Sequence, residues 1–259
     1  MRRALPWVGL LILAISFFWL IHLPTPVQQA TAPPTRSAAP GDRPLVIVLD
    51  PGHGGQDSGA MCGSVMEKDL TLDVALRTKS LLHALGYTVI LTRDRDRYLS
   101  LAERAAVGNK LDDSLFVSIH FNDGKSTTAS GVETYYALRR PAARSGLLAW
   151  LPFWPHDDSG RLVTRSQSLA DFIQNALVER TQAINRGIKS EQYYVIANVR
   201  HPAALVEGGF ITNSQDVTKL ASGQYRQQIA NAIRDGVERY HRTVLGSVPT
   251  LAYAAAPAE

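Results

Sequence analysis

Among the residues whose side chains can bind metals or move protons, four stand in distinctive local runs. Two are histidines: His53 lies in Asp-Pro-Gly-His-Gly-Gly and His120 in Ser-Ile-His-Phe-Asn. Two are carboxylates: Glu67 precedes Lys-Asp, and Glu207 lies in Val-Glu-Gly-Gly-Phe. Two imidazoles and one carboxylate around an open position form a catalytic zinc site, because water or substrate takes the fourth place. His53, Glu67 and His120 are therefore the candidate ligands of Zn2+, and Glu207 is left as a carboxylate outside the ligand set.

Each of these residues also has a structural explanation. A histidine beside glycines can simply occupy a turn, and His120 at the end of a strand can be a hydrogen-bonded core residue. Glu67 can simply be an acidic residue in the first turn of a helix, where it interacts favourably with the helix dipole. Glu207 is harder to explain, because it follows an apolar run and an unpaired buried charge is costly. The four residues together favour a functional site.

The segments that carry these residues alternate between strand and helix patterns. The apolar run at 45–49 is typical of a strand buried on both faces of a sheet. Leu70, Val74, Leu81 and Leu85 share one helical face, and a glycine follows them. The remaining patterns predict strands at 87–91, 115–119, 132–137, 193–196 and 203–206, and helices at 100–107, at 168–184 and through Ile229 to Tyr240. We expect an α/β fold, an open and mostly parallel twisted sheet with helices on both faces. Its zinc site would lie at the C-terminal ends of the strands.

Other catalytic motifs are absent from the sequence. The glycines between 52 and 59 do not match a dinucleotide fingerprint, and there is no phosphate-binding Gly-Lys-Ser/Thr loop. The sequence also contains no His-Glu-x-x-His helix and no Gly-x-Ser-x-Gly elbow. Cys62, the single cysteine, excludes an intrachain disulfide, and no partner base stands near it in the sequence.

The first 23 residues predict a membrane anchor or signal segment. Arg2 and Arg3 precede an apolar run at 4–23, and about 20 apolar residues span a hydrocarbon core of about 30 Å. The arginines predict that the N-terminus is cytoplasmic and that the following residues lie outside the membrane. An uncleaved anchor is favoured because a proline follows the Ala-Thr-Ala pattern at 30–32, and cleavage is the alternative.

The rest of the chain divides by composition. Residues 24–44 predict a Pro/Ala-rich linker, 45–246 a single catalytic domain and 247–259 a disordered tail. Within the domain, the segment 139–165 contains Pro141, Gly146, Pro152 and Pro155, which deny it a long helix, and two apolar clusters with three aromatic residues. We interpret it as a flap or regulatory insertion, with a surface loop as an equal alternative.

The net charge of +4 over 259 residues first suggests an anionic partner such as nucleic acid. However, three arginines and no acidic residue fall in the first 40 positions, and 24 basic residues face 23 acidic ones thereafter. The basic excess is therefore explained by membrane topology, and we expect no nucleic-acid partner.

The order of these motifs resembles that of the zinc-dependent N-acetylmuramoyl-L-alanine amidases, which cut bacterial cell wall. The matching positions cover about residues 45–243: 50–55, Glu67-Lys68, Thr92-Arg93, 101–104, 118–120 with Asn122, and 206–210 with Asn213. The resemblance implies that His53, Glu67 and His120 bind zinc and that Glu207 is the catalytic carboxylate. It also implies hydrolysis of the amide between N-acetylmuramic acid and L-alanine in peptidoglycan.

Further expectations depend on this resemblance. Asn122 and Asp50 are candidates for the outer hydrogen-bond partners of the zinc-bound imidazoles, since such imidazoles normally donate their other N–H. We expect the protein on the periplasmic side of a bacterial envelope, tethered to the inner membrane, with an envelope activator protein as a partner. Three alternatives remain: an inactive peptidoglycan-binding or regulatory module of the same fold, a zinc peptidase that cuts another cell-wall amide, and a hydrolase that uses Cys62.

Overall fold

The computed structural model describes residues 45–138 and 159–246. The predicted anchor or signal segment at 1–23, the linker at 24–44 and the tail at 247–259 lie outside these residues. Most of the segment predicted as a flap, 139–165, also lies outside them. Among the described residues, no helix combines the length and the apolar character that crossing a membrane requires.

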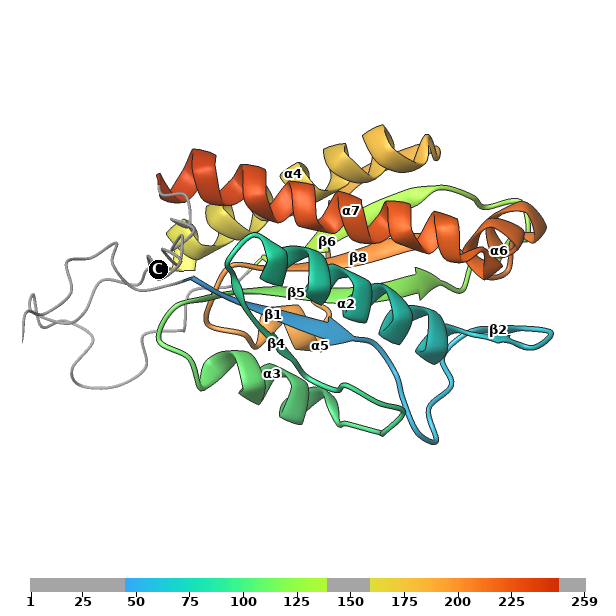
Figure 1. Cartoon of the computed structure of the whole chain (residues 1–259), viewed down its shortest axis with the longest axis horizontal. Helices are drawn as coiled ribbons and strands as arrows, with labels where there is room; N and C mark the ends of the chain where they lie inside the picture. Colours follow the sequence, from blue (N-terminus) through green and yellow to red (C-terminus); the bar gives the residue numbers. More distant parts are fainter. Residues whose placement is uncertain (1–44, 139–158, 247–259) are drawn as a thin grey trace, which may run out of the picture. The chain divides into compact units, whose positions relative to one another are not determined.

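Six strands form one sheet at the centre of the domain (Figure 1). In their order across the sheet they are β4 (Thr88–Leu91), β1 (Val46–Pro51), β5 (Ser114–Asn122), β8 (Ala203–Phe210), β6 (Val132–Tyr136) and β7 (Asn185–Ser190). Every neighbouring pair is parallel except β6 with β8, which is antiparallel. The expected open and mostly parallel sheet is confirmed.

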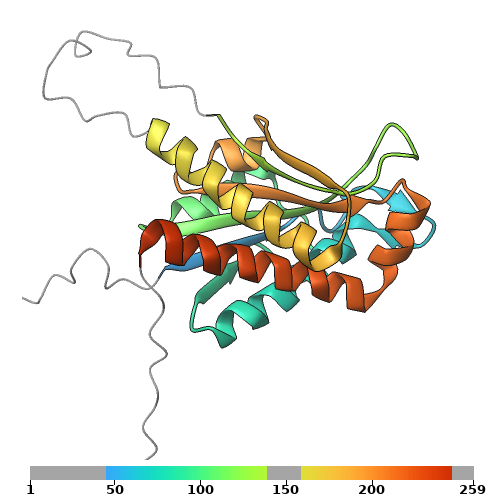
Figure 2. The ribbon, with the colours of Figure 1, turned by 90° about the horizontal axis from the view of Figure 1, so that it is seen from above.

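Helices cover both faces of this sheet (Figures 1 and 2). One face carries the larger core, packed by α2 (Glu67–Ala84), α4 (Ser159–Thr181) and α7 (Gly223–Tyr240). The other face carries a smaller core, packed by α3 (Leu101–Asn109) and α5 (Tyr194–Ala197). The described residues also form the short hairpin of β2 (Met61–Cys62) and β3 (Val65–Met66), the helix α6 (Ser214–Ala221) and the π-helical turn η1 (His241–Leu245).

Side-chain alternation along β5 separates the core from the site. Val117, Ile119 and Phe121 belong to the larger core. Because successive side chains of a strand point to opposite faces, His120 and its alternate neighbours face the side of α3 and α5. Within residues 45–138 and 159–246, two short helices cover that side, and the side chain of His120 is 20% exposed.

The structure differs from the sequence-based expectation in several elements, and β2, β3 and α6 are among those that were not expected. The strand predicted at 193–196 is wrong, because these residues begin the helix α5, which buries Val195 and Ile196 against the sheet. The helix predicted at 168–184 begins earlier, at Ser159, and ends at Thr181. The strand β7 was not expected, because its sequence Asn-Arg-Gly-Ile-Lys-Ser is polar and lies at the edge of the sheet, with no apolar alternation.

Candidate active site

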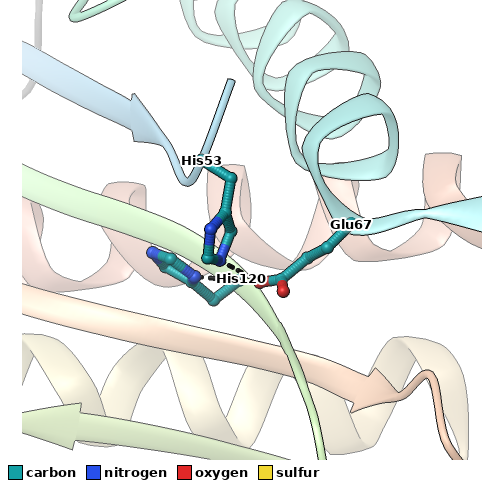
Figure 3. A group of neighbouring side chains, drawn as sticks. All are labelled: His53, Glu67 and His120. Carbon is teal, nitrogen blue, oxygen red and sulfur yellow. Dashed lines mark hydrogen bonds and ion pairs between the residues drawn. The ribbon is translucent and has the colours of Figure 1, made fainter. Parts of the chain in front are cut away.

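The imidazoles of His53 and His120 and the carboxylate of Glu67 meet at the C-terminal ends of β1 and β5 (Figure 3). His53 follows β1, His120 lies near the end of β5, and Glu67 is the first residue of α2. Glu67 Oε1 lies 3.1 Å from His53 Nε2 and 2.9 Å from His120 Nδ1. One ligand atom from each residue lies within 4.8 Å of the others. The structure thus brings together the three residues that the sequence suggested as ligands.

Two glycines let these side chains approach so closely. A Cβ atom added to Gly52 would lie 2.2 Å from Cε1 of His120. One added to Gly59 would lie 2.5 Å from Oε2 of Glu67, and Gly59 also has a φ of +64°, which favours glycine. His53 itself has a φ of 57°, an uncommon conformation for a residue with a side chain. The glycine-rich loop therefore places His53 at some cost in backbone strain.

Buried arginines hold this loop by its carbonyl oxygens. Arg93 donates from Nη2 to the carbonyl oxygen of Gly52 over 2.7 Å. Arg104 donates from Nη2 to the carbonyl oxygen of His53 over 2.6 Å, and from Nη1 to Oδ1 of Asp50 over 3.0 Å. Both guanidinium groups are almost fully buried, so their donors are committed to fixing the loop.

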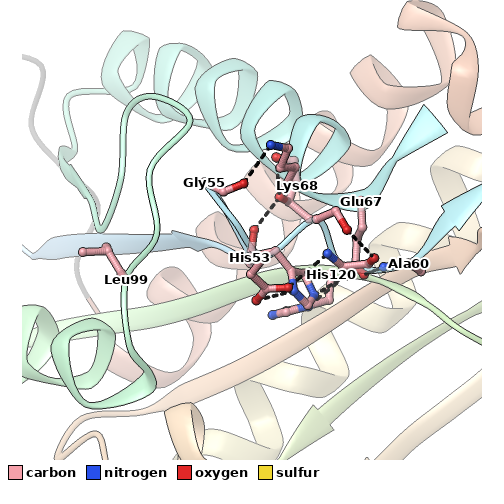
Figure 4. A network of polar contacts seen from close by, with 12 residues as sticks. His53, Gly55, Ala60, Glu67, Lys68, Leu99 and His120 are labelled. Atoms are coloured by element: carbon pink, nitrogen blue, oxygen red, sulfur yellow. Dashed lines mark hydrogen bonds and ion pairs between the residues drawn. The ribbon is translucent and has the colours of Figure 1, made fainter. Parts of the chain in front are cut away.

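Backbone groups fix the other side of the cluster (Figure 4). Glu67 Oε2 accepts a hydrogen bond from the backbone N–H of Ala60 over 2.9 Å, and Oε1 accepts one from Phe121 over 3.0 Å. Next along α2, Lys68 donates from Nζ to the carbonyl oxygen of Gly55 over 3.0 Å. These contacts tie the first turn of α2 to the loop after β1, so Glu67 and His53 keep a fixed relative position.

Hydrogen bonds to the imidazoles control the ionisation of the cluster. Burial alone would raise the pKa of Glu67, but its hydrogen bonds with His120 and His53 outweigh burial and hold the pKa far below its ordinary value. Burial would lower the pKa of His53, but hydrogen bonds and charge interactions with Glu67 and Asp57 outweigh it and raise the pKa. The carboxylate of Glu67 is therefore ionised at neutral pH and able to bind a cation.

The outer partner of His53 is Asp57, which sequence reasoning did not consider. Asp57 Oδ2 lies 2.9 Å from His53 Nδ1, so it fixes the ring with Nε2 directed at Glu67. Asp50, one of the two expected partners, instead accepts hydrogen bonds from Thr92, Ser118 and Arg104. It supports the His53 loop through Arg104, because its buried position at the end of β1 faces α3.

The second expected partner, Asn122, donates from Nδ2 to Oε1 of Glu133 over 2.9 Å. It therefore contacts a carboxylate on β6 rather than an imidazole. The role of Asn122 and Asp50 as outer partners of zinc-bound imidazoles stays a prediction. Among the described residues, the side-chain hydrogen bonds of Asn122 and Asp50 go to Glu133 and to Thr92, Ser118 and Arg104.

Glu207 stands beside this cluster on the neighbouring strand. In the register of β5 and β8, Glu207 is paired with His120. Its side chain is buried, and Oε2 has no hydrogen-bond partner among the described residues. Burial raises the pKa of Glu207 well above its ordinary value, and the negative charges of Glu67 and Glu133 add to this effect. A buried carboxylate with an unused oxygen beside a cluster of metal-binding side chains is suited to accept and return a proton.

The three-residue cluster fits a zinc ion. Imidazole nitrogens and carboxylate oxygens are common zinc ligands, and a catalytic site has three protein ligands and an open position. Glu67 Oε1 lies within hydrogen-bonding distance of one nitrogen of each imidazole, and one ligand atom from each of the three residues lies within 4.8 Å of the others, close enough for one ion to contact all three. Asp57 supplies the carboxylate–histidine contact that orients such ligands.

Sequence reasoning missed three further residues near Glu207. Glu133 of β6 is paired with Glu207 across the antiparallel strands. It accepts hydrogen bonds from Arg186 and Lys189 of β7. Glu133 follows Gly-Val in a strand that was predicted, so a charged residue in a buried strand was the available signal. Nothing local marks Arg186 and Lys189, because only the pairing of β6 with β7 brings them to the site.

Comparison with known proteins agrees with this geometry. A family model described as N-acetylmuramoyl-L-alanine amidase matches residues 47–239. The N-acetylmuramoyl-L-alanine amidase LytC of Bacillus subtilis (strain 168) is 37% identical over 196 residues, which are 76% of this chain and 35% of LytC. This chain thus spans about a third of the length of that relative.

Solved structures give the same result. The catalytic domain of CwlV, an N-acetylmuramoyl-L-alanine amidase from Bacillus (Paenibacillus) polymyxa var. colistinus, is similar with a TM-score of 0.64 and 30% identity, covering 76% of this chain and 97% of that one. The CwlD amidase from Clostridioides difficile, solved in complex with the GerS lipoprotein, is similar with a TM-score of 0.64 and 27% identity, covering 76% of this chain and 98% of that one. The motif order, the fold and the family match agree: this chain belongs to the N-acetylmuramoyl-L-alanine amidase family.

Proposed function

We propose that this chain is a zinc-dependent hydrolase of peptidoglycan. It cuts the amide that joins the lactyl group of N-acetylmuramic acid to L-alanine. The observation that supports this most is the position of Glu207, a buried carboxylate with an unpartnered oxygen, on the strand next to His120 in a member of this family. An inactive binding module would not need an unpaired carboxylate there, because such a group destabilises the fold.

In the proposed reaction, His53, Glu67 and His120 would hold the ion. Bound there, zinc supplies Lewis-acid chemistry, which polarises the amide carbonyl and acidifies water. Glu207 accepts the proton of the attacking water at Oε2 and donates it to the nitrogen of L-alanine as the amide breaks. The raised pKa of Glu207 suits this role, because the protonated form must persist until the amine leaves.

Two partly buried hydrogen bonds support the rigid part of the site. Asp57 keeps the His53 ring in one orientation, and Arg104 holds the carbonyl oxygen of His53. A site held in this way loses little energy to reorganisation when the substrate binds.

The location follows from the substrate, since peptidoglycan lies outside the cytoplasm in the bacterial envelope. We propose in addition that residues 1–23 tether the domain to the cytoplasmic membrane, because an arginine pair precedes an apolar run of membrane-spanning length. Removal of residues 1–23 should release the protein from the membrane fraction. Protein that stays in that fraction would contradict the tether.

An envelope protein is a further proposed partner. The amidase CwlD was solved in complex with the GerS lipoprotein, and its fold matches 76% of this chain. We propose that this chain also responds to a protein activator at the membrane. Activity of the purified domain on cell wall that equals its activity in intact envelopes would argue against such an activator.

A chelator experiment tests the proposed function. Treatment with chelator should abolish release of stem peptides from purified peptidoglycan, and added zinc should restore it. Glu207→Gln should keep its affinity for zinc but release no peptide. Cys62→Ser is the matched control and should retain full activity, because Cys62 is exposed in the β2–β3 hairpin. Chelator-resistant activity, or loss of activity in Cys62→Ser, would contradict the proposal.

A further inference from the structure

Two cations of the edge strand β7 converge on one carboxylate beside Glu207. Arg186 donates from Nε to Oε2 of Glu133 over 2.8 Å, and Lys189 donates from Nζ to the same oxygen. The other oxygen, Oε1, accepts from Tyr135 over 2.7 Å and from Asn122 over 2.9 Å. Glu133 is buried, and these partners together hold its pKa low, at about 2, although burial alone would raise it. Each oxygen of the Glu133 carboxylate thus accepts two hydrogen bonds, and the carboxylate stays ionised.

A bulge in β7 makes this convergence possible. Arg186 and Lys189 are three residues apart, and on a regular strand residues three apart point to opposite faces. Val132 is paired with Asn185 and Thr134 with Ile188, so two residues of β7 stand opposite Glu133. The extra residue, Gly187, has a φ of +76°. The bulge therefore turns both cations to the face that carries Glu133, and bulges of this kind often redirect side chains at functional sites.

The two cations retain unused donors toward solvent. The side chain of Arg186 is 34% exposed and that of Lys189 is 39% exposed, whereas that of Glu133 is 4% exposed. The guanidinium contacts Glu133 through Nε, and no described residue bonds to the edge formed by its two terminal nitrogens, which can therefore take another partner. The ring of Phe210 lies under the guanidinium at 4.9 Å and limits its orientation. Two cations on one carboxylate leave one positive charge in excess at this position.

This positive position lies within reach of a substrate bound at Glu207. The strands β8, β6 and β7 are neighbours in the sheet, and neighbouring strands are about 4.8 Å apart. The backbone of β7 is therefore about 10 Å from that of β8. Since an extended peptide advances about 3.4 Å per residue, a group two or three residues beyond the scissile amide can reach Arg186.

We infer that Arg186 and Lys189, held in place by Glu133, form a binding subsite for a carboxylate of the peptide stem. This inference rests on the proposed function and assigns the direction in which the substrate lies. The glycan side of the scissile bond offers no anion, because N-acetylated sugars are neutral and the lactyl carboxyl is consumed in the amide. The peptide side carries carboxylates, which a guanidinium edge binds through two parallel hydrogen bonds. The stem therefore extends from Glu207 across β6 toward β7, and the glycan lies on the side of β1.

The experiment compares purified peptidoglycan with the same material after its carboxylates have been converted to amides by carbodiimide and ammonia. Release of stem peptides is measured as new amino groups over a range of substrate concentrations. For wild type, kcat/KM should be about tenfold higher on the untreated material than on the amidated material. A tenfold ratio corresponds to about 1.4 kcal/mol of binding free energy. Most of the difference should be in KM, since the contact is equally present before and during the reaction.

Variants separate the subsite from a structural role of the cations. Arg186→Ala should raise KM for untreated material and bring the ratio between the two substrates close to one, and Lys189→Ala should lower that ratio in part. Arg186→Lys should keep most of the preference. Arg239→Ala is the matched control, since Arg239 is an exposed arginine whose partner is Glu179 of α4. Thermal melting of each variant shows whether the fold is kept.

The outcomes distinguish the two claims. If wild type releases no stem peptides from either material, the proposed function fails and the subsite fails with it. If wild type cuts both materials equally well, or if folded Arg186→Ala keeps the wild-type preference, the cations only neutralise Glu133 and the inference is overturned.

Discussion

The contact of Gly52 with the His120 ring provides a sharp test of the site geometry. A Cβ atom at position 52 would lie 2.2 Å from Cε1 and 2.4 Å from Nε2 of His120. Ordinary contacts of a Cβ atom begin near 3.4 Å, so Gly52→Ala requires the ring or the loop to move by about 1.2 Å. The backbone of Gly52 is not in the left-handed region, so alanine introduces no conformational strain of its own. The effect therefore comes from the clash between the new Cβ atom and the His120 ring, which changes the position of the ring relative to the loop.

The size of this displacement sets the expected effect. Metal–ligand distances are tolerated within about 0.2 Å, and a misplacement of about 1 Å in a catalytic site costs about 100-fold in rate. We expect Gly52→Ala to lower kcat/KM on peptidoglycan at least about 100-fold and to weaken zinc binding. Overpacking at a buried position should also lower the free energy of unfolding by about 1–3 kcal/mol.

The assay combines three measurements on the same protein: competitive titration of zinc against a chelator, the rate of stem-peptide release, and urea unfolding. Gly160→Ala is the control, because a Cβ atom at Gly160 meets nothing within 4 Å and the residue lies in the first turn of α4. It should match wild type in all three measurements. A folded Gly52→Ala protein with wild-type zinc affinity and activity would refute the placement of His120.

Three further predictions follow from burial and charge. Arg104→Met should destabilise the fold by about 3 kcal/mol in urea unfolding, because Asp50 loses its buried partner, and an unchanged midpoint would contradict this. Glu207→Gln should abolish activity yet unfold at an equal or higher temperature, because a neutral amide replaces a carboxyl group whose charged form burial destabilises and whose Oε2 has no partner among the described residues; a clearly lower melting temperature would contradict this burial cost. In chelator-treated protein, the raised pKa of His53 adds stability below pH 6.5 that is lost as pH rises through the raised value, so His53→Asn should lower the melting temperature most at acidic pH. A difference from wild type that grows toward pH 8 would contradict the sign.

Sequence reasoning found the parts of the molecule whose signals are local. The apolar run at 45–49 and the leucine spacing in α2 both reflect burial in the core, so the strand β1 was predicted within two residues of its bounds and the presence of the helix α2 was predicted. His53, Glu67, His120 and Glu207 were found because each follows a strand or begins a helix, and parallel strands bring such positions to one edge. His53, Glu67 and His120 meet in the structure, and Glu207 is paired with His120 in the strand register, which agrees with that rule.

What sequence reasoning missed depends on pairing between distant segments. Asp57 was overlooked as the partner of His53 because the left-handed backbone of His53, which turns the ring toward it, is not visible in the residue types. The strand β7 is a polar edge strand, and its bulge at Gly187 cannot be read from alternation. The helix α5 has the Tyr and Val residues typical of a strand, but burial of Val195 and Ile196 against the sheet overrides that preference.

The bond that is cut tests the central claim most directly. Purified peptidoglycan is digested with wild-type protein and with Glu207→Gln, and the soluble products are analysed by mass spectrometry. Wild type should release stem peptides that begin with L-alanine and carry a new amino terminus, and the Glu207→Gln protein should release none. Products that still carry N-acetylmuramic acid on the stem, or the same stem peptides from the Glu207→Gln protein, would contradict the account.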